Sequence, residues 1–277
     1  MKIASYSVGD EQSFGLAVGN GLVDLKRRGV ATTLRELLDR SSLPLAADFA
    51  DEAPDFTLDD VLLLPVIPDP AKIICVGINY LAHAAEGNRS VPEDPALFLR
   101  TTQSIVGSGS GVVLPRVSSH YDYEGELALV IGRRGRHITA SEASGYIAGY
   151  CCFNDGSVRD YQSHSLPVGK NFEKSGACGP WLVTPDEAGP GPFDLTTRVN
   201  GEIRQHVSTD QMVYPIADVI AYASRFTELL PGDIIATGTP SGVGARRSPP
   251  QWLAAGDRIE IEISRLGLLR NTVVQEI

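Results

Sequence analysis

The chain has 277 residues, of which 43% are hydrophobic and 21% charged, which is enough to bury one sizeable core. Its formal net charge of −10 and the lack of a long basic stripe argue against nucleic acid or an anionic membrane as a partner. The sequence shows neither a secretory leader nor an apolar run near the ~20 residues of a membrane span, so we expect a cytosolic protein.

The beginning of the chain predicts a small α/β module. Two stretches before residue 26 alternate apolar and polar residues, as strands do, and the apolar spacing at 32–40 predicts a helix. Three prolines within 65–70 cannot continue a helix or a central strand, which suits a boundary. We therefore expect an N-terminal module at 1–68 and a catalytic domain at 69–277.

The rest of the chain predicts mainly strands. Segments bounded by glycine, proline and aspartate clusters indicate strands at 73–78, 111–115, 125–132, 146–153, 180–184, 195–201, 233–238 and 258–264. Helices are expected chiefly near 80–87, 141–145 and 215–228, too few for a regular alternation of strands and helices. The predicted fold class is therefore α+β, mainly β, with a mixed sheet.

Three acidic residues, Asp122, Glu124 and Glu126, alternate along a segment that runs directly into the apolar sequence LALVI. In a strand they would share one face, about 7 Å from one to the next. One interpretation is a solvated acidic face on an edge strand. The apolar run indicates instead a strand covered on both faces, where carboxylates need a cation, and a hard metal ion would satisfy them.

A polar segment, NDGSVRDYQ at 154–162, follows the predicted strand at 146–153. Its carboxylate, guanidinium and amide groups could supply a third oxygen ligand from Asp155 and a fork for a substrate carboxylate. Asp155 is equally compatible with a simple turn or a helix cap.

His83 and Glu86 are spaced i, i+3 in the predicted helix near 80–87 and would share one face of it. The carboxylate could orient the imidazole and make His83 a general base for water. A surface pair without function explains the spacing equally well. Gly87 and the polar residues after it suggest a mobile segment that could close over a site.

Two further features could contact a substrate. The segment TGTPSGVG at 237–244 lacks both the Walker and the dinucleotide-binding patterns, but its amides and hydroxyls could bind a carboxylate. The alternative is a glycine-rich turn without a ligand. Lys170, in the sequence VGKNF, could neutralise the charge of an enolate, although most single lysines are simply solvated.

In this order, these segments resemble the fumarylacetoacetate hydrolase family over roughly residues 70–275. The likeness is carried by NYLAHAAEGN, DYEGELALVIG, FNDGSVRDYQ, VGKNF with GPWLV, TRVNGEIRQ and PGDIIATGTPSGVG. The resemblance implies a mixed β-sandwich roll with the smaller N-terminal module attached, usually assembled as a homodimer.

The resemblance also implies a metal site and a catalytic pair. Glu124, Glu126 and Asp155 would bind Mg²⁺ or Mn²⁺ as the cofactor. His83 and Glu86 would form the pair that activates water, on a segment that closes over the substrate.

The substrate side follows in the same way. Lys170 would act beside the enolate, while Arg159, Gln162 and Thr239 would contact the substrate. Many members read Phe-x-Lys where this chain has FLR, so Arg100 is expected to replace that substrate-side cation with a planar fork.

These roles suggest a hydrolase that cleaves the carbon–carbon bond of an acylpyruvate, such as a fumarylpyruvate-like or maleylpyruvate-like diketo acid. Water activated by His83 would attack the distal carbonyl carbon, the bond between C3 and C4 would break, and pyruvate and a carboxylic acid would be released. The expected partner is a small keto acid.

Other reactions suit the same site. Decarboxylation of oxaloacetate needs no attacking water, and isomerisation of a hydroxymuconate-type diene needs only proton transfer. A non-enzymatic protein that senses keto acids is a further alternative, but it would leave the pair of His83 and Glu86 without a role. The intact pair favours hydrolysis.

Overall fold

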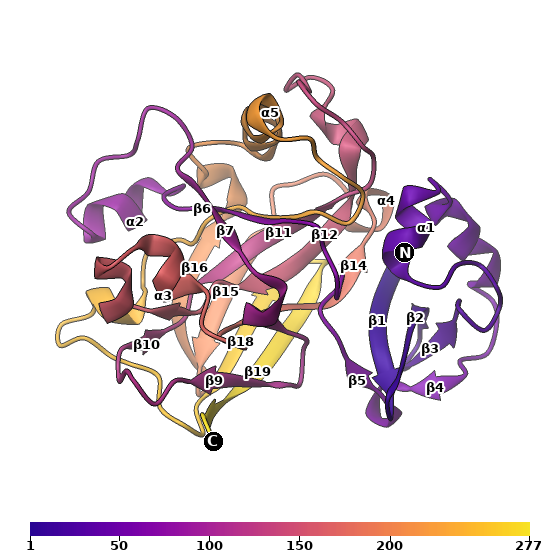
Figure 1. The fold of residues 1–277 in the computed structure, drawn as a ribbon, viewed down its shortest axis with the longest axis horizontal. Helices are drawn as coiled ribbons and strands as arrows, with labels where there is room; N and C mark the ends of the chain where they lie inside the picture. The colour runs from indigo at the N-terminus through magenta and orange to yellow at the C-terminus, as the bar shows by residue number, and fades with distance from the viewer.

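One long mixed sheet of twelve strands runs through the structure, a computed structural model that describes residues 1–277 (Figure 1). Its strands are β1 (Lys2–Val8), β2 (Glu11–Val18), β3 (Gly21–Asp24), β4 (Phe56–Thr57), β5 (Leu62–Leu63), β6 (Ile73–Val76), β7 (Leu97–Arg100), β8 (Ile105–Val106), β11 (Gly125–Ile131), β12 (Ile147–Asn154), β14 (Gly176–Val183) and β17 (Ile234–Ala236). In space they follow the order β4-β3-β2-β1-β14-β12-β11-β17-β6-β7, with β5 beside β1 and β8 beside β14. Most neighbours are antiparallel, but β17 and β6 are parallel.

A second sheet of five strands packs against the first. Its strands are β9 (Gly111–Leu114), β15 (Asp194–Val199), β16 (Glu202–Ser208), β18 (Arg258–Ile263) and β19 (Gly267–Gln275), in the order β16-β15-β18-β19-β9. Leu127 and Cys152 of the large sheet share a buried cluster with Ile261 and Leu269 of the small one. The two layers confirm the predicted fold class: α+β, mainly β, with a mixed β-sandwich.

Helices are short and lie outside the sheets (Figure 1). They are α1 (Leu34–Asp39), α2 (Leu81–Glu86), α3 (Leu166–Lys170), α4 (Pro185–Ala188) and α5 (Ile216–Phe226). Short 3₁₀ helices add η1 (Leu43–Phe49), η2 (Leu58–Asp60), η3 (Thr102–Ser104), η4 (Ala143–Tyr146), η5 (Asp160–Ser163), η6 (Thr209–Gln211) and η7 (Gly244–Arg246). None of the helices has the length and apolar character needed to cross a membrane.

Strand β11 is the centre of the core, and all seven of its residues are buried. Because side chains alternate along a strand, Ala128 and Val130 join one apolar cluster while Leu129 and Ile131 join another on the opposite face with α5. This double coverage explains the continuous apolar sequence. The acidic residues stand at the start of this strand, so they too are enclosed by protein.

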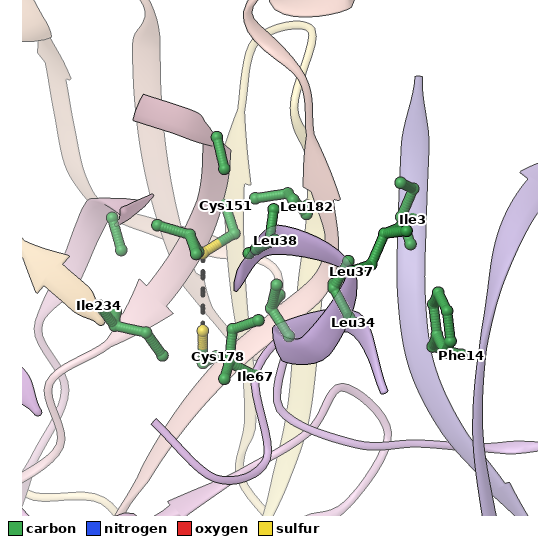
Figure 2. Close-up of a cluster of buried hydrophobic side chains, with 14 of the residues drawn as sticks. Ile3, Phe14, Leu34, Leu37, Leu38, Ile67, Cys151, Cys178, Leu182 and Ile234 are labelled. Carbon is green, nitrogen blue, oxygen red and sulfur yellow. Dashed lines mark hydrogen bonds between the residues drawn. The ribbon is translucent and has the colours of Figure 1, made fainter. Parts of the chain in front are cut away.

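The N-terminal elements share the sheet and the core with the rest of the chain. Strand β1 pairs with β14, with Ile3 opposite Leu182, and Leu37 of α1 packs in the same cluster as Leu182 (Figure 2). In this cluster the thiols of Cys151 and Cys178 lie 3.6 Å apart without a disulfide. The division of the chain after residue 68 stays a prediction.

Most expected elements occur where the sequence indicates them, with two kinds of difference. The expected helix near 141–145 is a single 3₁₀ turn. Strands β7, β16 and β19 and helix α3 were not expected, since polar or mixed residues obscure their periodicity.

Candidate active site

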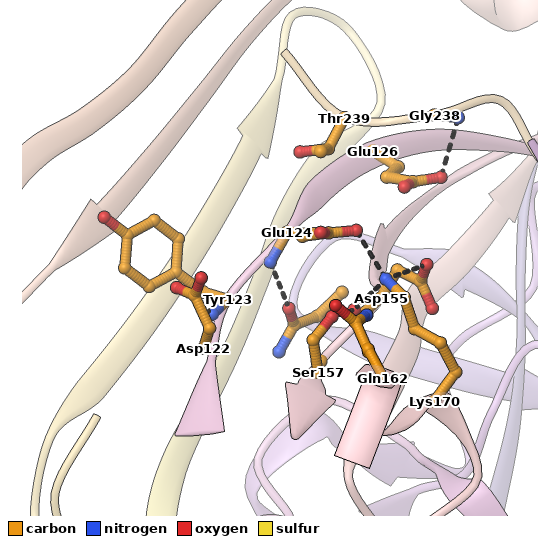
Figure 3. A network of polar contacts seen from close by, with 12 residues as sticks. Asp122, Tyr123, Glu124, Glu126, Asp155, Ser157, Gln162, Lys170, Gly238 and Thr239 are labelled. Atoms are coloured by element: carbon orange, nitrogen blue, oxygen red, sulfur yellow. Dashed lines mark hydrogen bonds and ion pairs between the residues drawn. The ribbon is translucent and has the colours of Figure 1, made fainter. Parts of the chain in front are cut away.

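Three carboxylates meet where β11 begins and β12 ends. Glu124 directly precedes β11, Glu126 lies in it and Asp155 directly follows β12. The register that places Gly125 opposite Asn154 brings these ends together. One oxygen from each acid lies within 4.8 Å of the others, and all three side chains are buried (Figure 3). The structure therefore joins the three residues that the sequence predicts as metal ligands.

The charges of this triad are poorly balanced. Burial raises the pKa of Glu126 well above its ordinary value, and the charges of Asp155 and Glu124 add to the effect. Burial would also raise the pKa of Glu124, but the charges of Lys170 and Arg159 outweigh it and lower that pKa to about 2. Three hard oxygen donors with surplus negative charge fit a divalent cation such as Mg²⁺ or Mn²⁺.

Lys170, at the end of α3, bridges two acids of the triad. Its Nζ donates to Oε2 of Glu124 at 2.5 Å, and to Oδ2 and the backbone oxygen of Asp155 at 2.6 and 3.1 Å (Figure 3). Burial would lower the pKa of Lys170, but the two carboxylates outweigh it and raise that pKa. An ammonium group has three protons, and all three are used here. Lys170 is thus the charge partner of two acids, and its role beside a substrate enolate stays a prediction.

Arg100 lies behind the triad. Its Nη1 donates to Oδ1 of Asp155 at 2.5 Å and to the backbone oxygen of Gly156, and its other nitrogens bond to Ser104 and Ser175. The side chain has no exposed surface. Every part of the fork thus faces protein, and the expected contact between Arg100 and a substrate stays a prediction.

Arg159 connects the triad to a second acid. Its Nη1 lies 2.7 Å from Oε1 of Glu124, while Nε and Nη2 lie 2.8 Å from Oδ2 of Asp122. Asp122 also accepts hydrogen bonds from the amides of Gly244 and Ala245. Asp122 is therefore not part of the metal cluster, and instead fixes a loop beside it.

His83 and Glu86 form the expected pair on α2. His83 Nδ1 lies 2.8 Å from Oε1 of Glu86, and the other carboxylate oxygen accepts from the amide of Gly242. The carboxylate thereby fixes the ring, and with the proton on Nδ1 the second ring nitrogen, Nε2, is free to act as a base.

The glycine-rich segment after β17 closes the site from another direction. The amide of Gly238 donates to Oε2 of Glu126 at 2.8 Å, so this loop directly holds one metal ligand (Figure 3). Thr239 is buried, and its hydroxyl donates to the backbone of Gly125 and accepts from Nε2 of Gln205. The expected contact between Thr239 and a substrate carboxylate stays a prediction.

Two amide side chains were missed at the sequence level. Gln205 bonds to Thr239, to the oxygen of Pro240 and to the amide of Gly125, and so ties β16 to the site. Asn79 donates to the backbone oxygen of Thr237 and exchanges bonds with Tyr214. Both lie within quoted motifs, but neutral amides carry no charge signal that would single them out.

A cavity of about 530 Å³ opens onto this centre. His83, Glu124, Arg159, Gln162 and Lys170 line it, so half of the ten predicted site residues face one space. The side-chain nitrogen of Gln162 is buried without a hydrogen-bond acceptor, as expected of a group that awaits a ligand oxygen. The remaining lining residues are Gly77, Ile78, Gly87, Arg89, Ala96, Phe98, Ser163, Leu166, Val243, Ala245, Arg246 and Trp252.

Comparison with known proteins gives concordant matches. The mitochondrial oxaloacetate tautomerase Fahd2a of Rattus norvegicus is 40% identical over 276 residues, which cover 96% of this chain and 88% of the relative. The solved structure of maleylpyruvate hydrolase from Sphingobium sp. SYK-6 in complex with manganese(II) and pyruvate is 28% identical, with a TM-score of 0.82 over all of both chains. That of 2-hydroxyhepta-2,4-diene-1,7-dioate isomerase from Mycobacterium marinum is 31% identical, with a TM-score of 0.77 over 100% of this chain and 99% of the other.

The family match covers most of the chain. The model described as fumarylacetoacetate (FAA) hydrolase C-terminal matches residues 72–274, which include every residue of the site described above. The chain therefore belongs to the fumarylacetoacetate hydrolase family, as an enzyme whose buried acids suit a divalent metal ion.

Proposed function

We propose that this enzyme interconverts the keto and enol forms of a small 2-oxo dicarboxylate, with oxaloacetate as the first substrate to test. The observation that carries the proposal is that a carboxylate-held imidazole, His83 with Glu86, lines the same cavity as the triad's Glu124. The 40% identity to an oxaloacetate tautomerase supports this choice of substrate.

The proposed reaction needs one base and a stabilised oxygen. When bound, a divalent metal ion would polarise the 2-oxo group and stabilise negative charge on its oxygen. His83 would take a proton from C3 through Nε2, while Glu86 holds the ring and stabilises the imidazolium. A proton is then added to the oxygen on C2, which gives the enol, so the reaction consumes no second reactant. Arg159 and Gln162 would orient the substrate from the cavity wall.

Hydrolysis of an acylpyruvate is the second candidate. The same base could instead take a proton from water, which attacks C4; the bond between C3 and C4 then breaks, and C3 leaves with its electron pair and is protonated to give pyruvate. The likeness to a maleylpyruvate hydrolase supports this reaction, as does a pair placed to activate water. Decarboxylation of oxaloacetate would need the same electron sink but no water.

One panel separates the three reactions with the Mg²⁺- or Mn²⁺-loaded protein. Tautomerisation predicts faster loss of the ultraviolet absorbance of enol oxaloacetate without CO₂, decarboxylation predicts CO₂, and hydrolysis predicts acid release from acylpyruvates. A His83→Ala variant serves as the control for each. Binding of keto acids without turnover in any of the three assays would favour a non-enzymatic sensor of keto acids and overturn the proposal.

We also propose that the protein is a cytosolic homodimer. Measurement of its mass in solution and of its location in the cell tests this.

A further inference from the structure

We propose that Arg246, together with Arg89, forms a subsite that selects substrates by a second, distal carboxylate. The inference rests on the proposed 2-oxo acid function of the cavity and adds the residues that determine its specificity. Both arginines line the cavity that contains Glu124 and Lys170.

The first argument is the charge in the cavity. Its lining includes one carboxylate, Glu124, and four cations, Arg89, Arg159, Lys170 and Arg246, of which Arg159 and Lys170 neutralise Glu124 and acids beside it. The positive charge that remains at Arg89 and Arg246 attracts ligands of the opposite sign. The cavity is therefore suited to an anionic substrate.

The second argument separates the four cations. Lys170 and Arg159 are already paired with Glu124 and with acids beside it. The side chains of Arg89 and Arg246 make no hydrogen bond or ion pair in the structure, and both are exposed to the cavity and solvent. One anionic group of a substrate would meet the triad's metal ion and Arg159. The two unpaired guanidiniums, of Arg89 and Arg246, remain available for a second anionic group of the substrate.

The third argument is that the backbone of the loop that carries Arg246 is fixed. The backbone amide of Gly242 donates a hydrogen bond to Glu86, and the amides of Gly244 and Ala245 donate to Asp122, so the loop is held at both places. At Gly244 a Cβ atom would lie 2.0 Å from the oxygen of Gln251, so the loop needs a glycine to pack there. The backbone that carries Arg246 is thus hydrogen-bonded to Glu86 of the catalytic pair and to Asp122, the partner of Arg159, which fixes where this side chain begins relative to the reacting centre.

Part of the cavity wall is apolar. Val243, Leu166 and Trp252 line the cavity, and the ring of Trp252 packs edge-on against His120 at 4.8 Å. A hydrocarbon spacer would suit this wall, whereas a spacer rich in hydroxyls would leave them without partners. The preferred ligand is therefore a 2-oxo acid with a short apolar spacer and a terminal carboxylate.

Binding of unreactive ligands tests the subsite without turnover. Calorimetry with MgCl₂ would compare 2-oxoglutarate with 2-oxopentanoate and 2-oxoadipate with 2-oxohexanoate, which are pairs of equal length that differ in the terminal carboxylate, with pyruvate as the common core. We expect the diacid to bind roughly tenfold more tightly than its partner at one or both lengths, the usual size of a charge-assisted contact. The ratio of the diacid affinity to the monoacid affinity should fall as salt is added.

Variants assign the effect to the subsite. Arg246→Gln should bring the ratio close to one, Arg89→Gln should lower it, and Arg246→Lys should keep part of it. Arg134→Gln is the matched control, because it removes the same charge from an exposed ion pair with Glu228 and should preserve the ratio. Circular dichroism and thermal unfolding of each variant show that it is folded.

Each result decides the question. If pyruvate binds but the wild-type protein prefers neither diacid, or if Arg246→Gln keeps the preference, the subsite is wrong and the proposed function stands. If pyruvate and all four ligands fail to bind in the presence of Mg²⁺ and of Mn²⁺, the proposed function fails and the subsite fails with it.

Discussion

The guanidinium of Arg100 and the carboxylate of Asp155 form an ion pair at 2.5 Å, and at most 1% of either side chain is exposed. Arg100 holds one oxygen of Asp155, while Lys170 holds the other. The orientation of this metal ligand is therefore set before any cation arrives, and a bound metal ion must compete with Lys170.

We predict that loss of the Arg100 fork destabilises both the fold and the metal site. Arg100→Met leaves a buried carboxylate without one partner and should lower the free energy of unfolding by about 3–5 kcal/mol. Arg100→Lys keeps the charge but loses donors, so about 1–2 kcal/mol and weaker metal binding are expected. Urea denaturation and metal titration measure the two effects. Arg134→Lys, in a surface pair, should change stability by less than about 0.5 kcal/mol, and an equally stable Arg100→Met protein would contradict the prediction.

The raised pKa of Glu126 predicts how stability depends on pH. An acid whose pKa is higher in the folded state favours folding most when protonated, so the metal-free protein should lose stability as pH rises from the ordinary value of 4.5 through the folded pKa. A divalent metal ion requires the ionised form, so its stabilising effect should grow over the same range. Thermal unfolding at several pH values, with and without Mg²⁺, measures this.

A variant isolates that effect. Glu126→Gln removes the charge but can still accept from the amide of Gly238, so the metal-free protein should unfold at a temperature a few degrees higher. The increase in melting temperature with Mg²⁺ or Mn²⁺ should disappear. A variant that is stabilised by metal as strongly as the wild type would show that Glu126 is not a ligand.

We predict that His83 is needed for chemistry and not for metal binding. His83→Ala should lower kcat by about 10²–10⁴-fold, the usual contribution of a general base, with the metal affinity nearly unchanged. Glu86→Gln should have a smaller effect, because the imidazole of His83 is still present as the base and loses only its charged partner. His206→Ala, which removes an exposed histidine on β16, is the control. Full activity in His83→Ala would exclude both proposed mechanisms.

Gly244 should be sensitive to a single methyl group. In Gly244→Ala the new Cβ would lie 2.0 Å from the oxygen of Gln251 and 2.7 Å from Oδ1 of Asp122, so the loop must move. We expect about 1–3 kcal/mol of destabilisation and a larger KM for a dicarboxylate substrate. Gly145→Ala is the matched control, because its Cβ meets no atom within 4 Å. Equal stability and KM in both variants would mean that the loop adjusts freely.

Local patterns in the sequence predict much of the fold and of the site. The alternation of Glu124 and Glu126 before an apolar run indicates buried acids on a strand, and the spacing of His83 and Glu86 indicates a pair on a helix. The third acid, Asp155, was offered by the polar segment after a strand only as one of two interpretations, and the family resemblance was needed to choose between them, because its place depends on the register between β11 and β12.

The direction of Arg100 was not predictable. It depends on packing between segments far apart in the chain: Gly176, 76 positions further along, leaves room for the guanidinium, since a Cβ there would lie 2.7 Å from Nη2. The sequence around Arg100 or around Gly176 does not indicate that the two residues are in contact. A cation in a motif thus indicates that charge is needed nearby, but not whether the charge faces the ligand or supports it from behind.

The pairing of β1 with β14 has a practical consequence for work with the catalytic region. A truncated chain that starts at residue 69 would leave the edge of β14 at Leu182 and Val183 unpaired and would remove Leu34, Leu37 and Leu38 from the apolar surface they cover. Open strand edges and uncovered apolar patches both promote aggregation. Such a fragment should therefore be insoluble even though every catalytic side chain is present.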